Sequence, residues 1–571
     1  MPYRAPVSEF RFILDHVVGF SQVSDTERFA EATPDTVEAI LTEAGRMCEE
    51  VFAPLNRNGD LDPARLENGV VRCSKGFAGG YQAIVDGGWM GISAPEEFGG
   101  MGLPHTLTTA FNDMTSASCL ALGLNPLLTQ GQIEALEAHA PDWMKALYLP
   151  KLISGEWTGT MNLTEPQAGS DVGALASKAV PNGDGTYAIT GQKIFISWGD
   201  HDVAENVCHA VLARLPDAAP GTRGISLFMV PKMIPNEDGS LGASNSLRVV
   251  SLEHKMGLHG SPTCVMSYEG ATGWLIGEEN KGMAAMFTMM NNARLAVGVQ
   301  GVGVADGAYQ HALAYALERK QGKTPVQGSG AIVDHADVRR MLLTMKADLF
   351  AARAIAMANA VALDMQKATG SGEWIARAAL LTPIAKAFGT EIGVRVAELG
   401  VQVHGGMGFI EETGAAQYSR DVRVTTIYEG TNGIQAMDLV ARKMMDGGEA
   451  AYELLEEIQL LAEFARKDFA ELGGPVWQAA ESLREATEWM VATDDMNARF
   501  AGAVPYLMAF ARVLGGHFHL KAAMEEADEG PRRKLARFYI ARLLPEHIGL
   551  LTQAMAGAKD LYALTPEEMS Q

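Results

Sequence analysis

The sequence predicts an α+β protein that is mostly α-helical, with one β domain between helical regions. Apolar residues recur at helical spacing from residue 34, and helical patterning returns after residue 279. Between these regions, turn and strand signals dominate. A chain of this length suits roughly three or four domains. The expected segments are an N-terminal extension (1–33), a helical domain (34–157), the β domain (158–278), a helical bundle (279–447) and an extra C-terminal helical domain (448–571).

The first strong helix is expected over residues 34–52. Thr33 is a suitable N-cap, and Pro34 fits the first helical position, where a backbone N–H is not needed. The apolar residues that follow at i, i+3, i+4 and i+7 spacing are Val37, Ile40, Leu41, Ala44, Met47, Cys48 and Val51. Helical patterning then continues to about residue 157, with a break at the Pro- and Gly-rich stretch 94–104.

The β domain is marked by a turn followed by strand-like runs. Residues 182–185 read Asn-Gly-Asp-Gly, and residues 187–196 have the pattern of a strand with a tight connection. Residues 209–215 and 224–230 predict further strands.

The last third of the chain is expected to be helical throughout. Gly447-Gly448 marks a joint between the bundle and the C-terminal helices. We expect those later helices to be interrupted at residues 473–475 and 530–531, where glycine precedes proline.

The charge of the chain disfavours some partners. Net charge is −23 at neutral pH, and no cluster of Lys and Arg offsets it. Binding to nucleic acids or anionic membranes needs basic residues that neutralise phosphates, so neither is expected. No apolar run has the length of a membrane span, and the N-terminus lacks a signal-peptide core. A cytoplasmic location is therefore expected.

Metal sites are also not expected. The five cysteines contain no Cys-x-x-Cys pair, which argues against zinc or iron–sulfur sites and suits a reducing compartment. His517 and His519 are two positions apart on a predicted helix, so they point to different faces and would not share a metal.

The most informative segment is 420–432, which contains Tyr428-Glu429-Gly430-Thr431. The β-branched residues before Glu429 predict an extended run, and Asn432 is the candidate N-cap of a following helix, with Gln435 three positions on. A carboxylate in such a corner, shielded by apolar neighbours, could remove a proton from a weakly acidic C–H group. From these residues alone, a surface glutamate in a turn before a helix is an equal alternative.

Two segments of the β domain could contact a planar ligand. Residues 161–172 form a turn-rich loop with hydroxyls at Thr164 and Ser170, whose N–H groups could bind a heterocycle and a diphosphate. A simple connector has the same composition. Phe195 and Ser197 share one face of a predicted strand, where a ring beside a hydroxyl would suit a planar heterocycle. A half-buried strand end is the alternative there.

A third segment, 402–409, is a tight glycine turn. Its glycines allow close approach of the backbone to a ligand or unusual dihedral angles. The segment lacks the G-x-G-x-x-G spacing and follows no predicted strand, so a nicotinamide-binding Rossmann site is unsupported.

Together and in this order, these segments resemble the acyl-CoA dehydrogenase family of flavoenzymes, from roughly residue 34 to 445. The strings 95–100, 255–262 and 334–341 add to the resemblance. The family fold is a helical domain, a barrel-like β domain and a four-helix bundle, in the order predicted above. The two ends of the chain resemble a branch with larger subunits, which has an N-terminal extension and an extra C-terminal helical domain.

The resemblance implies roles for individual residues. Glu429 matches the base that removes the α-proton of the acyl thioester. A second base position, used in another branch, is Ala293 here, and alanine cannot accept a proton. The positions that match substrate contacts are Ser170, Asn291, Arg294, Tyr428 and Gly430.

FAD is the cofactor that the resemblance implies. The positions that match its contacts are Met161, Leu163, Thr164, Ser170, Phe195, Ser197, Arg319, Gln321, Gln402, Gly405, Gly406 and Thr431. Phe195 and Ser197 replace a Trp and a Thr of the family, and they keep an aromatic ring and a hydroxyl. Gly322 and Gly433 replace a Phe and a Gln, so the contacts next to Gln321 and Thr431 are altered. Part of this site is shared between subunits in the family, so a homodimer is implied, with a tetramer as the alternative.

The implied reaction is the α,β-dehydrogenation of an acyl-CoA to its trans-2-enoyl-CoA, with electron-transfer flavoprotein as the acceptor. Likeness within the larger-subunit branch favours 3-methylmercaptopropionyl-CoA as the substrate and methylthioacryloyl-CoA as the product. A medium or long straight-chain acyl-CoA is the alternative. An acyl-CoA oxidase and a non-catalytic, DNA-associated homologue are further alternatives, and the acidic C-terminal domain disfavours the second.

Overall fold

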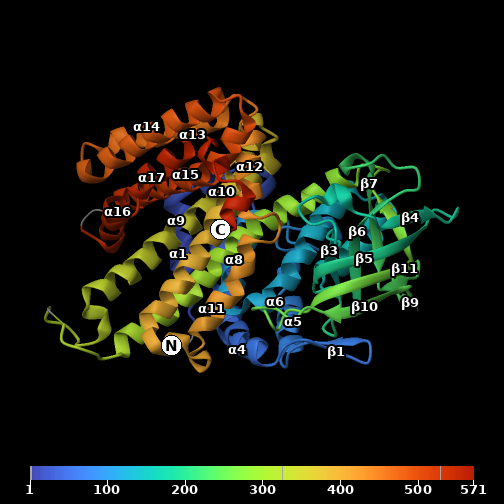
Figure 1. Ribbon diagram of the computed structural model, residues 1–571. Helices are drawn as coiled ribbons and strands as arrows, with labels where there is room; N and C mark the ends of the chain where they lie inside the picture. Colours follow the sequence, from blue (N-terminus) through green and yellow to red (C-terminus); the bar gives the residue numbers. More distant parts are fainter. Residues whose placement is uncertain (1–2, 325, 527–528) are drawn as a thin grey trace. The chain divides into compact units, whose positions relative to one another are not determined.

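The computed structural model of the protein describes residues 3–324, 326–526 and 529–571 (Figure 1). The chain forms two compact units. The β-sheet unit comprises Glu43–Thr108 and Ser118–Ala293, and the helical unit comprises Met1–Thr42, Thr109–Ala117 and Arg294–Gln571. Helices α3 (Pro34–Met47), α6 (His105–His139) and α8 (Gly282–Glu318) contribute residues to both units.

A seven-stranded sheet forms the centre of the β-sheet unit within the described residues. Its strands are β3 (Trp157–Asn162), β4 (Lys178–Pro181), β5 (Tyr187–Ser197), β6 (Asn206–Arg214), β7 (Ile225–Pro231), β10 (Leu247–Leu252) and β11 (Thr263–Ile276). The order is β10-β11-β5-β4-β6-β3, and β7 pairs with both β11 and β6, so the strands close into a barrel-like ring (Figure 1). Strand β6 runs parallel to β3 and β4, and the other pairs are antiparallel.

Both faces of β6 and β7 are buried, which explains the nearly continuous apolar sequences of these two strands. In β6, Val211 and Ala213 belong to one core, and Ala210 and Leu212 belong to the other. The second core also contains Tyr148 and other residues of α6 and α7 (Asp142–Ile153). The period of two along the strand therefore divides its side chains between two apolar layers.

The helix predicted over residues 34–52 is confirmed, and helical structure continues to Leu61 with a change of type at Cys48. The hydroxyl of Thr33 accepts from Thr36 N at 3.2 Å, which confirms the N-cap. α3 then ends at Met47, a single π-helical turn follows over Cys48–Phe52, and α4 covers Ala53–Leu61.

Two small hairpins were not predicted. They are β1 (Arg65–Glu67) with β2 (Val70–Arg72), and β8 (Met233–Pro235) with β9 (Leu241–Ser244). Strands of three or four residues carry too few alternations to be recognised from sequence. The other helix of this unit is α5 (Phe77–Asp86).

Long helices pack closely in the helical unit. Its first helices are α1 (Val7–Phe12), α2 (Ser21–Ser24), α9 (Ala336–Thr369), α10 (Gly372–His404), α11 (Ala415–Val422) and α12 (Asn432–Ala441). Gly298 of α8 allows close contact with α10, because a Cβ there would lie 2.6 Å from Ala385 O. Arg353 of α9 forms buried ion pairs with Asp113 at 2.8 Å and Asp306 at 3.0 Å, which join three helices.

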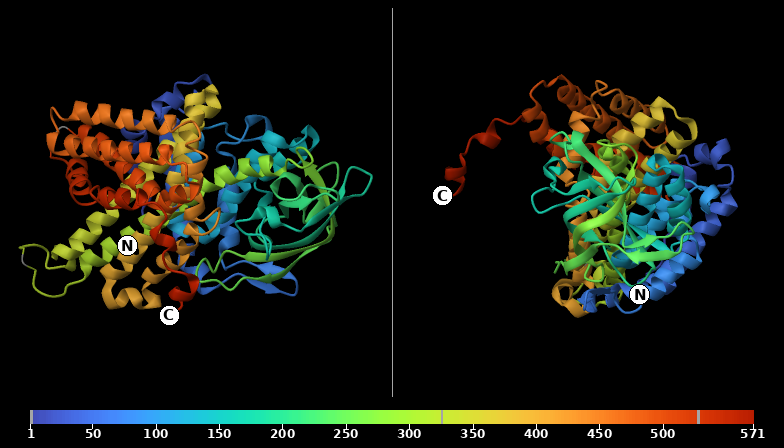
Figure 2. Two further views of the ribbon diagram at one scale, coloured as in Figure 1. Left: turned by 45° about the horizontal axis from the view of Figure 1, so that its top comes forward. Right: turned by 90° about the vertical axis from the view of Figure 1, so that its right-hand side faces the viewer.

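The C-terminal helices are α13 (Glu449–Ala465), α14 (Ala470–Ala492), α15 (Met496–Met524), α16 (Pro531–Arg542), α17 (Glu546–Ala554) and α18 (Pro566–Met569). They lie side by side as far as α17, and the residues after α17 extend away from them (Figure 2). Buried Arg512 pairs with Asp348 of α9 and lies 2.8 Å from Glu546, so α15 is tied to the bundle.

The expected interruption at 473–475 is wrong, because α14 runs through these residues. Gly473 lies against α13, where a Cβ would come within 2.6 Å of Ala462 O, so glycine here permits close helix packing. The interruption at 530–531 is confirmed, since α16 begins at Pro531. No helix in the described part of the chain is both long and apolar enough to cross a membrane.

Candidate active site

Glu429 lies in a tight corner of the helical unit. Its φ of +56° is in the left-handed region, which residues with a side chain rarely adopt, and Gly430 follows with a φ of +84°. Gln435 Nε2 donates to Glu429 O at 3.2 Å, and Lys386 Nζ donates to Gly430 O at 2.9 Å. Side chains of α10 and α12 therefore hold a strained backbone at this carboxylate, which is a feature typical of functional sites.

The segment before this corner is helical, so the expectation of an extended run is wrong. α11 leads directly into a 3₁₀ segment, Arg423–Thr426, and both Val422 and Thr425 are fully buried. Packing of one helical face outweighs the β propensity of Val and Thr here. The N-cap of α12 is Thr431, which accepts from a helical N–H at 3.3 Å, and Asn432 is already inside the helix.

Two cations lie near Glu429. Lys386 Nζ donates to Asn432 Oδ1 at 2.9 Å, and Arg294 Nη1 lies 3.5 Å from Asp438 Oδ2. Both cations interact electrostatically with Glu429, yet no ion pair within 4 Å joins either one to it among the described residues. The carboxylate is therefore influenced by positive charge without being bound by it.

This environment tunes Glu429 for proton transfer. Burial raises the pKa of Glu429 to about 7, and the charges of Arg294 and Lys386 oppose part of the rise. Burial lowers the pKa of Lys386 to about 8, against the attraction of Glu429 and Glu391. The side chain of Glu429 is only half-buried, so a ligand can reach it. A carboxylate with a pKa near neutrality is suited to act as a base at neutral pH.

The residues beside Glu429 leave one donor available. The hydroxyl of Tyr428 donates to Oε1 of Gln300, which is fully buried on α8, so the ring is held in place. Within the described residues, the backbone N–H of Glu429 has no hydrogen-bond acceptor. A carbonyl oxygen of a ligand could therefore accept from this N–H while the carboxylate reacts.

In the β-sheet unit, a buried ion pair anchors the loop after β3. Lys193 is fully buried, and its Nζ lies 2.8 Å from Glu165 Oε1 and donates to Leu163 O at 2.9 Å. Glu165 also accepts from the backbone N–H groups of Ala176 and Ser177 at 2.7 and 3.1 Å. Burial would raise the pKa of Glu165, but Lys193 and these hydrogen bonds lower it to about 2.

The predicted ligand-binding residues of this loop differ in exposure. Met161 belongs to β3, and Met161, Leu163 and Thr164 are half-buried, whereas Ser170 is exposed. Ile194 N donates to Thr164 O at 2.9 Å, so the loop is fixed to β5.

A β-bulge sits near the end of β5. Ile194 and Phe195 together oppose the single residue Val265 of β11. Phe195 has a φ of +60° and is 60% exposed, while Ile196 is buried in the core. Ser197 is half-buried, so Phe195 and Ser197 lie on the side of the strand away from the core, as the sequence pattern predicted.

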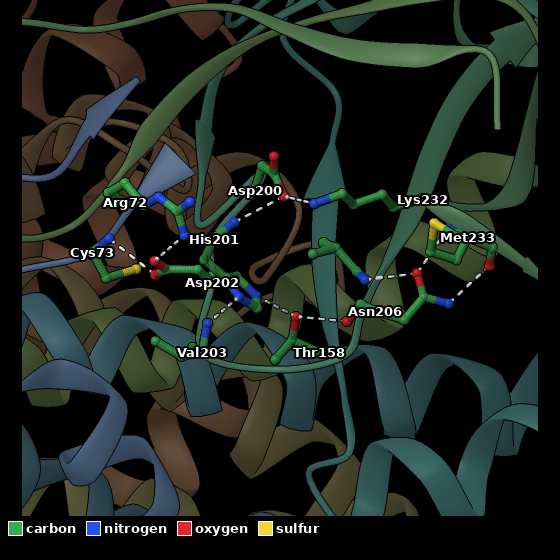
Figure 3. Close-up of polar contacts among 11 residues, drawn as sticks. Arg72, Cys73, Thr158, Asp200, His201, Asp202, Val203, Asn206, Lys232 and Met233 are labelled. Atoms are coloured by element: carbon green, nitrogen blue, oxygen red, sulfur yellow. Dashed lines mark hydrogen bonds and ion pairs between the residues drawn. The ribbon is translucent and has the colours of Figure 1, made fainter. Parts of the chain in front are cut away.

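A separate polar network holds the opposite end of β3 (Figure 3). His201 Nε2 lies 2.7 Å from Thr158 Oγ1, and His201 Nδ1 accepts from Val203 N at 3.4 Å. Asp200 Oδ1 lies 2.5 Å from Lys232 Nζ. Burial, together with the charge of Lys232, lowers the pKa of His201 to about 3, so the imidazole is neutral. This network fixes the start of β3, at the end of the strand opposite to the loop that Glu165 anchors.

The remaining predicted cofactor residues lie at the C-terminal ends of α8 and α10. These ends are neighbours, because the ring of His404 is 4.6 Å from that of His311 and 4.5 Å from that of Tyr315. The predicted residues there, all exposed, are Arg319, Gln321, Gln402, Gly405 and Gly406. A Cβ at Gly405 or Gly406 would meet no atom within 4 Å. Close packing within the described residues is therefore not the reason for a glycine at either position.

The helical unit thus brings the predicted residues together in two groups. The first is the corner formed by Arg294, Tyr428, Glu429, Gly430 and Thr431, and the second is the paired helix ends. Asn291 is exposed on α8 and belongs to the β-sheet unit. Sequence reasoning missed Lys386, although it is the only charged residue in the apolar run 380–390, a signal that could have identified it.

Family models match nearly the whole chain. They are "Acyl-CoA dehydrogenase, N-terminal domain" at residues 34–156, "Acyl-CoA dehydrogenase, middle domain" at 160–271, "Acyl-CoA dehydrogenase, C-terminal domain" at 280–445 and "Acetyl-CoA dehydrogenase C-terminal like" at 454–565. The chain belongs to the acyl-CoA dehydrogenase family. The resemblance inferred from the motifs is therefore confirmed.

Individual relatives agree with this assignment. The chain is 47% identical over 546 residues to 3-methylmercaptopropionyl-CoA dehydrogenase of Ruegeria pomeroyi, covering 92% of each protein. It is 34% identical over 580 residues to a butyryl-CoA dehydrogenase of Syntrophomonas wolfei, covering 94% of this chain and 93% of that protein. The crystal structure of Caenorhabditis elegans ACDH-11 in complex with C11-CoA has the same fold, with a TM-score of 0.78, 21% identity and coverage of 93% and 91%.

The enzyme is thus an FAD-dependent acyl-CoA dehydrogenase, as members of this family are. The residues of the β-sheet unit fit a flavin. Among the described residues, the hydroxyls of Thr164 and Ser197 have no hydrogen-bond partner, so both can bind the polar edge of a heterocycle. The exposed ring of Phe195 is next to Ser197 and can pack on the heterocycle. No group of three or more potential metal ligands occurs in the described part of the chain.

Proposed function

We propose that this enzyme converts 3-methylmercaptopropionyl-CoA to methylthioacryloyl-CoA, with Glu429 as the catalytic base. The substrate is supported by the similarity to the enzyme of that name over nearly the full length of both proteins. The role of Glu429 is carried by one observation, a carboxylate whose pKa burial raises to about 7 in a strained corner. The main alternative is a straight-chain acyl-CoA, as the name of the Syntrophomonas wolfei relative suggests.

The chemistry is a proton transfer coupled to a hydride transfer. The carboxylate of Glu429 takes the proton from Cα, and the hydrogen on Cβ leaves with two electrons as the Cα=Cβ double bond forms. When bound, FAD supplies the acceptor for that hydride. The α-proton of a thioester is too weakly acidic for an ordinary carboxylate. Donation from the N–H of Glu429 to the thioester oxygen would stabilise the charge that develops there.

Other residues position the two ligands in this proposal. Arg294, Asn291, Ser170, Tyr428 and Gly430 contact the CoA thioester. Met161, Leu163, Thr164, Ser170, Phe195 and Ser197 contact the flavin half of FAD, with Thr431 beside it. Arg319, Gln321, Gln402, Gly405 and Gly406 contact the rest of FAD across a homodimer or a tetramer. The exposure of this last group, with open space around both glycines, supports an arrangement in which a second subunit covers it.

We further propose a cytoplasmic enzyme that passes its electrons to electron-transfer flavoprotein. All five cysteines are free thiols, which suits a reducing compartment. An acyl-CoA oxidase would instead pass the electrons to oxygen. Turnover that requires a dye or electron-transfer flavoprotein and produces no hydrogen peroxide in air would support the dehydrogenase. Peroxide formed at the rate of turnover would identify an oxidase.

The substrate is tested with a panel of thioesters. The FAD-loaded enzyme would be mixed anaerobically with 3-methylmercaptopropionyl-CoA, butyryl-CoA and octanoyl-CoA, and the loss of the visible flavin absorbance would be followed. We expect the highest kcat/KM for 3-methylmercaptopropionyl-CoA. A higher value for either straight-chain thioester would replace the proposed substrate with the alternative.

A further inference from the structure

A cavity lies in the helical unit and shares no residue with the corner around Glu429. Its volume is about 310 Å³, at the lower end of the range for ligand pockets. Its lining comes from residues 17–22 of the N-terminal segment, from α9 and α10, and from α13 and α15. The helices α10, α13 and α15 are neighbours in the structure (Figures 1 and 2). The cavity therefore depends on the C-terminal helices for two of its walls.

α15 presents two polar side chains to this cavity. His517 and Lys521 are four positions apart, so they lie on the same helical face, and both line the cavity. His517 is only 2% exposed, and its Nδ1 has no hydrogen-bond partner among the described residues. Within the same described residues, no hydrogen bond or ion pair within 4 Å engages the half-buried ammonium of Lys521. Buried polar atoms without partners are rare and call for a ligand or water.

The other charges around the cavity are compensated. Arg377 Nη1 donates to Glu457 Oε2 at 2.7 Å, so these two groups neutralise each other. Glu373 is exposed in the first turn of α10, where the positive end of the helix stabilises a carboxylate. Lys521 is attracted by Glu457 and Glu525 and repelled by Arg377, but none of them binds it directly.

The imidazole of His517 is neutral. Burial lowers the pKa of His517 to about 3, in the same direction as the charges of Lys521 and Arg377 and against that of Glu457. A neutral imidazole can carry its proton on Nε2, which unlike Nδ1 is not enclosed by the protein, and donate from it. Lys521 and His517 together thus offer two donors, one of them charged, to a single acceptor group.

The rest of the lining is apolar. It includes Val17, Val361, Leu381, Leu454, Leu514 and Phe518. We propose that this cavity binds a small organic carboxylate, whose oxygens accept from Lys521 and His517 and whose apolar tail packs on these side chains. The volume is too small for a CoA thioester, so this ligand differs from the substrate in kind. The inference does not depend on the proposed substrate.

The test uses hexanoate as the probe and the full-length, FAD-loaded enzyme. Isothermal titration calorimetry would compare hexanoate with hexanamide, which keeps the shape without the charge, and with hexylamine, which inverts the charge. We expect hexanoate to bind about tenfold or more tightly than hexanamide, because a hydrogen bond to a charged group is lost with the amide. Hexylamine should not bind. Equal binding of all three, or none by hexanoate at millimolar concentration, would overturn the proposal.

Variants of two cavity residues, with one control, test whether hexanoate binds in this cavity. Lys521→Met keeps the apolar stem and removes the charge, and should weaken hexanoate binding about tenfold or more. Ala358→Leu adds bulk to the cavity wall and should also weaken it. Lys467→Met, at an exposed position of the same C-terminal region, is the matched control and should leave it unchanged. Circular dichroism and unchanged acyl-CoA turnover would verify folding. Binding that is equal in the wild type and both cavity variants would place hexanoate elsewhere and refute the site.

Discussion

Two glutamates of this enzyme each lie near a different buried lysine, and the pKa values of their carboxyl groups are shifted in opposite directions. Glu165 of the β-sheet unit contacts Lys193 at 2.8 Å and accepts two backbone N–H groups, and its pKa is about 2. Glu429 of the helical unit is near Lys386 and Arg294, but neither donates to it, and its pKa is about 7. Lys386 instead donates to the backbone carbonyl of Gly430.

The difference shows that a cation in direct contact with a carboxylate, together with hydrogen bonds to its oxygens, lowers the pKa of that group more than cations that do not contact it. Burial raises the pKa of both glutamates. At Glu165, donors to the charged oxygens reverse that effect and make the group a structural anchor. Near Glu429, the side chains of Lys386 and Gln435 donate to backbone carbonyl oxygens and not to the carboxylate. The pKa of the carboxyl group therefore stays raised. The same residue type therefore anchors a loop in the β-sheet unit, and in the helical unit it is the proposed catalytic base.

The largest expected effect is on turnover. Glu429→Gln should lower kcat/KM by about 10²–10⁴-fold or more, because the group that takes the α-proton is lost. The variant should keep its bound FAD, since the proposed flavin contacts do not include Glu429. Stopped-flow reduction of the flavin by substrate would measure the loss. Glu97→Gln, at an exposed position, is the control. Near-normal turnover in Glu429→Gln would remove Glu429 from its role.

The next effect concerns the structural glutamate. Glu165→Gln leaves the ammonium of Lys193 buried without its counterion, and should cost roughly 3–5 kcal/mol of stability. Urea unfolding at neutral pH would measure this cost. Because the pKa of Glu165 is lowered in the folded state, its contribution is present above its ordinary pKa and is lost as the pH falls towards 2. An unchanged midpoint at neutral pH would contradict the anchoring role of the ion pair.

Glu429→Gln should change stability with the opposite sign. A carboxyl group whose pKa is raised on folding begins to disfavour the folded state once the pH exceeds its ordinary pKa, and the loss is complete above the raised pKa. The variant should therefore be more stable than the wild type above pH 7, by on the order of 1–3 kcal/mol, and the gain should vanish near pH 4.5. Thermal unfolding at several pH values would measure the gain. A gain in stability that does not depend on pH would show that ionisation of Glu429 does not destabilise the folded state.

The smallest effect concerns the cation near the base. Lys386→Met removes a positive charge that favours ionised Glu429, so the pKa of Glu429 should rise further. Turnover at neutral pH should fall by about tenfold or less, and the acid limb of the rate profile should move to higher pH. Lys346→Met, exposed on α9, should leave the profile unchanged. A uniform loss of rate without movement of the limb would indicate only a backbone role for Lys386.

Local patterns explain why much of the fold was predictable. Helical spacing and the Thr33 cap identified α3, and the turn at 182–185 with the strand pattern after it identified β5, because each signal lies within a few residues. The string around Glu429 indicated a candidate carboxylate, and the resemblance to the acyl-CoA dehydrogenase family implied its role as the base. The order of helical and β regions followed from these local periods.

Features set by distant contacts were not predictable. The left-handed backbone of Glu429 depends on Lys386 and Gln435, which reach it from two helices. The run before it contains β-branched residues but is helical, because burial of Val422 and Thr425 decides the local structure. Helix α14 continues through Gly473 and Pro475, because packing against α13 favours a glycine there. Such choices arise from tertiary packing and leave little trace in a short window of sequence.

The pH dependence of kcat/KM tests the central claim most directly. The free enzyme must have Glu429 ionised to accept the α-proton, so kcat/KM should rise with pH and level off above an apparent pKa near 7. Anaerobic reduction of the flavin by substrate gives this profile without interference from the electron acceptor. An acid limb near pH 7 is the predicted result. A limb near pH 4.5, the ordinary value for a glutamate, or a profile without a limb between these values, would contradict the account.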